Sequence, residues 1–106
     1  MTTFDKREAG FENKFAHDEE LRFKATARRN KLLGAWAADK MGITGAAADS
    51  YAKDLVAFDL AESGEEDVVR KLVADFKAKN VGQSEQQIRA AMDQLMATAV
   101  AQIEAK

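Results

Sequence analysis

The chain lacks cysteine and proline, and histidine, tyrosine and tryptophan each occur once in its 106 residues. Without cysteine it can form neither a disulfide framework nor a thiolate metal site, and it has no cysteine nucleophile. No run of about 18 apolar residues is present to span a bilayer, and no apolar segment typical of a signal peptide opens the chain. We therefore expect a soluble intracellular protein.

A strong net charge is also missing. The 16 basic and 18 acidic side chains give a formal net charge of −2, which argues against general nucleic-acid binding, because such domains are strongly basic. The charges are nevertheless unevenly distributed. Residues 1–41 contain nine Lys or Arg and seven acids, whereas residues 42–106 contain seven and eleven, so the two parts sum to +2 and −4. The basic character is therefore confined to the first part of the chain.

The chain offers little of the chemistry that catalysis requires. His17 is the single histidine, which leaves no Glu-x-x-His pairs for a carboxylate-bridged metal centre. The segment GITG at residues 42–45 is too short for a phosphate-binding loop of the Walker type. The acids Glu65, Glu66 and Asp67 are better explained as the first turn of a helix. We therefore expect no enzyme activity, no metal site and no cofactor.

Alanine and helix-favouring charged residues dominate, and strand-like alternation is missing, so the regular structure is expected to be helical. We predict an all-α fold, a small four-helix bundle at residues 18–106 that follows a disordered or fraying arm at residues 1–17. The predicted helices cover residues 18–41, 45–61, 65–79 and 85–104. Short glycine-bearing links between them favour antiparallel neighbours.

Apolar spacing and end signals support these helices. Spacings of three and four residues predict buried stripes on the last three, and Ser84 followed by Gln87 is typical of a capping box. Gly42 is suited to end the first helix. The predicted stripes comprise Ala48, Tyr51, Leu55 and Phe58; then Val68, Val69, Leu72, Val73 and Phe76; and last Ile88, Met92, Leu95, Met96, Ala99 and Ile103.

The first predicted helix has two apolar faces. At 100° per residue one face carries Leu21, Ala25, Leu32 and Trp36, and a roughly opposite face carries Phe23, Ala27, Gly34, Ala37 and Met41. The second face consists largely of small residues, which permit a neighbouring helix to approach closely. Either the chain itself covers both faces, or part of this surface binds another protein. Both interpretations can hold at opposite ends of the helix.

A basic run without acids extends along this helix from Arg22 to Lys31. Its cations can form a solvated face that pairs with the acidic later helices, with their stems covering apolar surface. Alternatively, Arg28 and Arg29 contact an anion or an acidic partner, because guanidinium groups grip carboxylate or phosphate bidentately. With Trp36 nearby to stack a base, a nucleotide-sensing protein or helical adaptor is the alternative function class.

The arm carries Phe4, Phe11 and Phe15, which fall on one side if the segment becomes helical, among nearly balanced charges. An isolated helix this short is marginal in water, and Gly10 lowers its helicity by about 1 kcal/mol relative to alanine. We expect the arm to order on a partner, as an amphipathic helix enters a groove. The alternative is that the aromatic side chains fold back on the bundle.

The arm and first helix read FDKREAGFENKFAHDEELRFKATARRNKLLGAWAADKMG, and the segment from Phe15 to Ala38 is the part most typical of one protein family. This string resembles the zeta subunit family, the ATPase inhibitors of the F-type ATP synthase in alphaproteobacteria, and the similarity extends over essentially the whole chain. The resemblance implies a four-helix protein whose N-terminal segment inserts at a catalytic interface between alpha and beta subunits and blocks rotation in the hydrolytic direction. It also implies no catalysis by this chain.

The resemblance further implies partners and site residues. The partners are the alpha, beta and gamma subunits of the catalytic sector, so the protein is expected in the cytoplasm at the inner membrane, bound through the ATP synthase and not inserted in the bilayer. The inhibitory arm comprises Phe4, Lys6, Arg7, Phe11, Lys14, Phe15 and His17, and the further candidate contacts are Arg28, Arg29 and Trp36. Gly10 departs from the helix former expected in a segment that binds as a helix, and ordering the arm costs more there.

Overall fold

The computed structural model describes residues 19–62 and 64–104. They form the helices α2 (Glu19–Lys40), α3 (Gly45–Glu62), α4 (Glu65–Ala78) and α5 (Glu85–Glu104), and this part of the chain contains no strand. The prediction of an all-α, four-helix fold is confirmed, and each helix begins and ends within one residue of the predicted bounds. The predicted arm lies outside the described residues.

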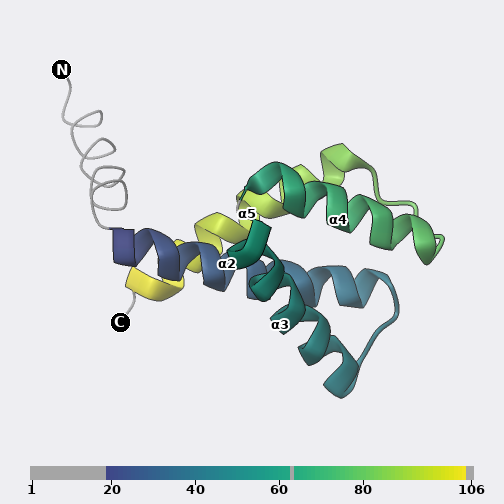
Figure 1. Ribbon diagram of the computed structural model, residues 1–106, viewed down its shortest axis with the longest axis horizontal. Coiled ribbons are helices and arrows are strands. Elements are labelled where there is room, and N and C mark those ends of the chain that lie inside the picture. The colour runs from purple at the N-terminus through teal and green to yellow at the C-terminus, as the bar shows by residue number, and fades with distance from the viewer. Residues whose placement is uncertain (1–18, 63, 105–106) are drawn as a thin grey trace.

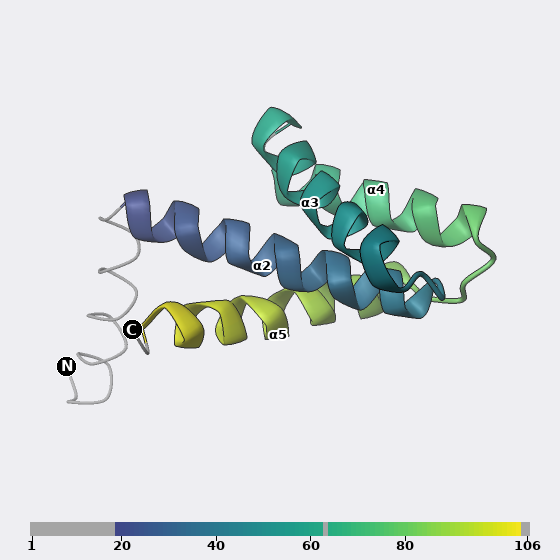
Figure 2. The same cartoon turned by 90° about the horizontal axis from the view of Figure 1, so that it is seen from below.

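Helices α2 and α5 run antiparallel and side by side, with the end of α5 next to the beginning of α2 (Figures 1 and 2). Helices α3 and α4 lie towards the C-terminal half of α2, as Figure 2 makes clear. Helix α2 packs against both α3 and α5, and α4 packs against the same two helices. The two halves of α2 therefore have different surroundings.

The hydrophobic core lies where the four helices meet. Each helix contributes large side chains to it, among them Leu33, Leu55, Leu72, Phe76, Ile88 and Met92, all at most 2% exposed. The stripe predicted for α4 is part of this core, with Val68, Val69, Leu72 and Phe76 buried and Val73 packed against them. Leu33 was not among the predicted core residues, because it falls between the two apolar faces of α2.

Gly34 explains how α2 and α3 come so close. A Cβ atom at this position would lie 2.5 Å from the Cα atom of Ala52. Only a glycine therefore fits between the two backbones, and the prediction that small residues on α2 permit close approach of a neighbouring helix is confirmed.

The helix ends follow local signals in the sequence. Gly42 and Asn80 adopt left-handed φ values of 75° and 58°. The backbone N–H of the next residue then donates a hydrogen bond to a carbonyl in the last turn of the helix, from Ile43 to Ala38 in α2 and from Val81 to Phe76 in α4. At the start of α5, the Gln87 N–H donates to Ser84 Oγ at 3.1 Å and the Ser84 N–H donates to Gln87 Oε1 at 2.8 Å. The predicted capping box is confirmed.

Candidate functional site

The seven arm residues predicted to contact the partner all precede Glu19 and so lie outside the described residues. Their contribution to binding stays a prediction. The structure does describe the helix that follows them, together with the three further candidates Arg28, Arg29 and Trp36.

Arg29 is buried, with only 3% of its surface exposed. Its Nε donates to Oδ1 of Asn30 at 2.7 Å, and one terminal nitrogen donates to Oε1 of Glu65 at 3.4 Å. Because the guanidinium is held by α2 itself and by the first turn of α4, Arg29 braces the fold.

Asn30 extends this brace to α3. It is 1% exposed, and its Nδ2 donates to Oδ2 of Asp59 at 2.7 Å. No buried side-chain nitrogen or oxygen in the described residues lacks a hydrogen-bond partner. Arg29 and Asn30 thus join α2 to the end of α3 and the start of α4. Sequence reasoning did not single out Asn30 as a buried residue. The available signal was that the polar pair Arg29 and Asn30 lies at helical spacing from apolar side chains of the same helix.

Trp36 and Arg28 have different surroundings from Arg29. The Trp36 ring packs edge-on against Phe76, with ring centroids 5.7 Å apart and planes at 80°. Arg28 is half-buried and forms no ion pair within the described part of the chain; it faces hollows that α2 forms with α3 and with α5. Since Arg29 is already engaged and Trp36 packs on the core, Arg28 is the one of the three that is available to a ligand.

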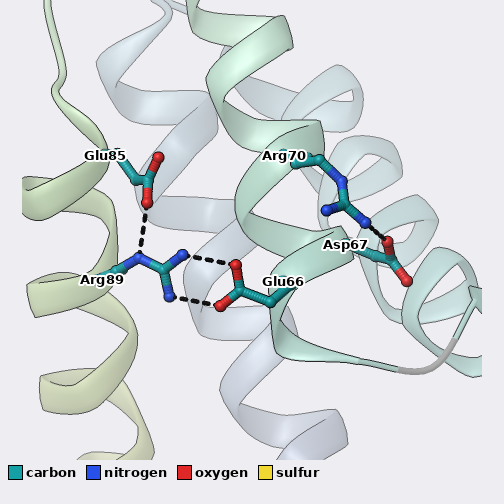
Figure 3. A network of polar contacts seen from close by, with 5 residues as sticks. All are labelled: Glu66, Asp67, Arg70, Glu85 and Arg89. Carbon is teal, nitrogen blue, oxygen red and sulfur yellow. Dashed lines mark hydrogen bonds and ion pairs between the residues drawn. The ribbon is translucent and has the colours of Figure 1, made fainter.

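Polar contacts also fix α4 to its neighbours. Two nitrogens of Arg89 donate to the two carboxylate oxygens of Glu66 at 2.8 Å, and its Nε donates to Glu85 at 3.0 Å (Figure 3). The hydrogen bond from Arg89 lowers the pKa of Glu66, and the attraction of its positive charge adds to this. Arg70 pairs with Asp67 on the same helix. The acids at the start of α4 therefore serve the fold, as predicted from their place in its first turn.

On the other side of α4, Tyr51 donates a hydrogen bond to Asp75 at 2.6 Å, and Lys71 pairs with the same carboxylate at 3.0 Å. The Lys71 ammonium also lies over the rings of Tyr51 and Phe58. Burial of Tyr51 raises the pKa of its hydroxyl, and the bond to Asp75 raises it further. This cluster joins α3 to α4.

The described residues contain no group of three or more His, Asp or Glu side chains placed to hold a metal ion. In the same part of the chain, every helix is too short or too polar to cross a membrane.

Comparison with known families identifies the chain. The family described as ATPase inhibitor subunit zeta matches residues 1–102, which include both the arm and almost all of the four-helix domain. The chain belongs to this family. The zeta resemblance seen in the sequence is confirmed, and the family is one of regulatory inhibitor subunits that act on an F-type ATP synthase.

A protein whose structure was solved in solution by NMR has the same fold, with a TM-score of 0.70. It is 44% identical in sequence, and the match covers 80% of this chain and 96% of the other. Comparison with curated proteins finds no match.

Proposed function

We propose that this zeta-family protein inhibits ATP hydrolysis by the F-type ATP synthase by inserting its N-terminal segment at a catalytic interface between alpha and beta subunits. The observation that carries the proposal is the family match, which begins at residue 1 and so includes Phe4, Phe11 and Phe15. The arm has the composition of a segment that gains apolar burial by ordering on a partner.

The inhibitory step is mechanical and needs no chemistry from this chain. A segment that binds only the rotational states with an open cleft stabilises those states, and it shifts the enzyme's conformational equilibrium by its differential affinity. Contacts with the gamma subunit would couple this block to rotation. The proposal includes a location at the cytoplasmic face of the inner membrane, through binding to the ATP synthase.

The four-helix domain supports this role as a rigid base. Helix α2 begins directly after the arm and is fixed to α3 and α4 by Arg29 and Asn30. Any force on the inserted arm is therefore passed to a helix that is anchored at its middle.

The test is inhibition of the cognate enzyme by the full chain and by a chain lacking residues 1–15. We expect the full chain to lower the rate of ATP hydrolysis and the shortened chain to have no effect, while circular dichroism shows the same helical domain in both. A variant with Gly10→Ala is expected to inhibit at lower concentration, because ordering the arm then costs about 1 kcal/mol less. A full chain without inhibitory activity would refute the proposal.

Nucleotide binding is the alternative that the basic run suggested. Arg28 favours nucleotide binding, because its guanidinium has no acidic partner in the described residues. NMR titration with nucleotide tests it: shifts that cluster at Arg28 and the Trp36 indole support a nucleotide site, and unchanged spectra remove it.

A further inference from the structure

Three hollows adjoin on the N-terminal half of α2. One of about 370 Å³ lies between α2 and α3, and a second of about 510 Å³ lies between α2 and the end of α5. A third of about 340 Å³ is lined by Lys31 of α2 and Lys53 of α3. Ala27 lines all three, so they form one surface, which we call the α2 groove.

Exposed apolar side chains line the α2 groove. Phe23 and Leu60 are the large hydrophobic side chains that stand exposed on the described residues, at 56% and 59%, and both line the first hollow. Val56 and Ile103 add further apolar surface from α3 and α5. Two exposed apolar side chains that meet at one hollow mark a site where a partner can bury them.

The rim of the groove is strongly positive. Its lining contains five cations, Arg22, Lys24, Arg28, Lys31 and Lys53, and a single carboxylate, Asp59, which already accepts the hydrogen bond from Asn30. Of the five cations, Lys24 alone forms an ion pair within the described residues, with Glu20. A chain with a net charge of −2 therefore concentrates unpaired positive charge around its exposed apolar side chains.

We propose that the α2 groove is a second docking surface, which binds an acidic segment with exposed apolar side chains on the ATP synthase that the arm inhibits. This inference rests on the proposed function. The groove begins within a few residues of the arm, so a partner that receives the arm presents neighbouring surface to the groove. A second contact of this kind raises affinity by making the two binding events intramolecular.

Charge distinguishes this occupant from two others. The chain's own arm has balanced charge, with three acids and three bases from Asp5 to Lys14, so it does not complement the rim. In a second copy the acidic cluster Glu65, Glu66 and Asp67 is not available to the groove, because each of these is already paired within its own chain, with Arg29, Arg89 and Arg70 respectively.

The test reverses the rim charges in the full-length protein. The variant Arg28→Glu, Lys31→Glu, Lys53→Glu is compared with a control of equal charge change, Lys40→Glu, Lys77→Glu, Lys79→Glu, whose lysines are exposed and form no ion pair in the described chain. We expect the groove variant to need at least about 10-fold more protein for half-maximal inhibition, with the same maximal inhibition, and the control to match the unchanged protein. The double variant Lys31→Glu, Lys53→Glu changes only exposed side chains and is expected to act in the same direction if the triple variant folds poorly.

Direct binding to the isolated catalytic sector separates this inference from the proposed function. If the unchanged protein binds but does not inhibit, the proposed function fails while the groove is still tested by loss of binding in the groove variant. Equal inhibition and equal binding by the groove and control variants would overturn the inference. Three other effects of reversing the rim charges would also overturn it. A shift of the arm's NMR signals in the free protein would mean that the arm occupies the groove, and loss of self-association would mean that a second copy does. An effect only on binding to anionic lipid vesicles would mean that the groove binds a membrane surface.

Discussion

Replacing Asn30 with alanine tests whether the basic run is a brace or a binding site. The substitution removes the bond that Asn30 accepts from Arg29 and the one that it donates to Asp59. A buried donor left without a partner costs about 1–3 kcal/mol, and more when it is charged, as Arg29 is. The Asp59 carboxylate is only half-buried, so water replaces much of its lost bond. Alanine recovers up to about 0.7 kcal/mol through its higher helix propensity.

We therefore expect Asn30→Ala to lower the free energy of unfolding by about 2–3 kcal/mol, a large share of the 5–15 kcal/mol typical of small domains. In thermal unfolding followed by circular dichroism this corresponds to a fall in Tm of roughly 10–20 °C. The matched control is Arg28→Ala, two residues away in the sequence and without an ion pair in the described residues, which is expected to change stability by less than about 0.5 kcal/mol.

A double substitution sharpens the test. Arg29→Met removes the buried charge together with the Nε–H group that donates to Asn30. Replacing a buried charged group with an apolar one is often neutral for stability. The pair Arg29→Met, Asn30→Ala is then expected to be more stable than Asn30→Ala alone. If Asn30→Ala unfolds at the same temperature as Arg28→Ala, the two residues do not brace the fold.

Two further substitutions test the packing of α3. Gly34→Ala is expected to lower the free energy of unfolding by about 1–2 kcal/mol, because the strain against the Ala52 backbone exceeds the gain of about 1 kcal/mol in helix propensity. Urea unfolding measures it, and higher stability would contradict the close contact. Tyr51, the single tyrosine, has a raised pKa in the folded state, so the stability that its un-ionised hydroxyl contributes is present below about pH 10 and is lost as the pH rises further. Phenolate absorbance should therefore appear together with loss of helix, and Tyr51→Phe should shift alkaline unfolding; phenolate formation in the folded protein would refute this.

Most of the fold could be predicted from local signals. The stripe of α4 and the capping box of Ser84 and Gln87 each depend on residues within a few positions of one another, so the sequence alone reveals them. The two apolar faces expected on α2 are buried only in part, since Ala25 and Ala37 are buried whereas Phe23 is 56% exposed. Leu33 lies between them and is fully buried, because α2 has neighbours on two sides there.

The candidate site could be predicted only in part, because burial of a charged residue depends on distant partners. Arg28 and Arg29 are adjacent cations in the same basic run, yet one is half-exposed and the other is buried. The difference comes from Glu65, 36 residues away, and from Asn30 with its bond to Asp59. The spacing of residues along the chain does not predict these pairings. The α2 groove was missed for the same reason, since Lys53 and Leu60 of α3 join it only through the crossing of the helices.

The arm and the α2 groove consist of different residues, so substitutions can separate inhibition from binding. If the arm blocks rotation and the α2 groove adds affinity, loss of either contact weakens the complex, but only loss of the arm abolishes the block. Substitution of Phe4, Phe11 and Phe15 by alanine in the full chain should then leave weak, salt-sensitive binding without inhibition. Reversal of the rim charges should instead leave complete inhibition at higher protein concentration. Because the two sets of variants fail in opposite ways, a single surface that performed both tasks could not reproduce the pattern.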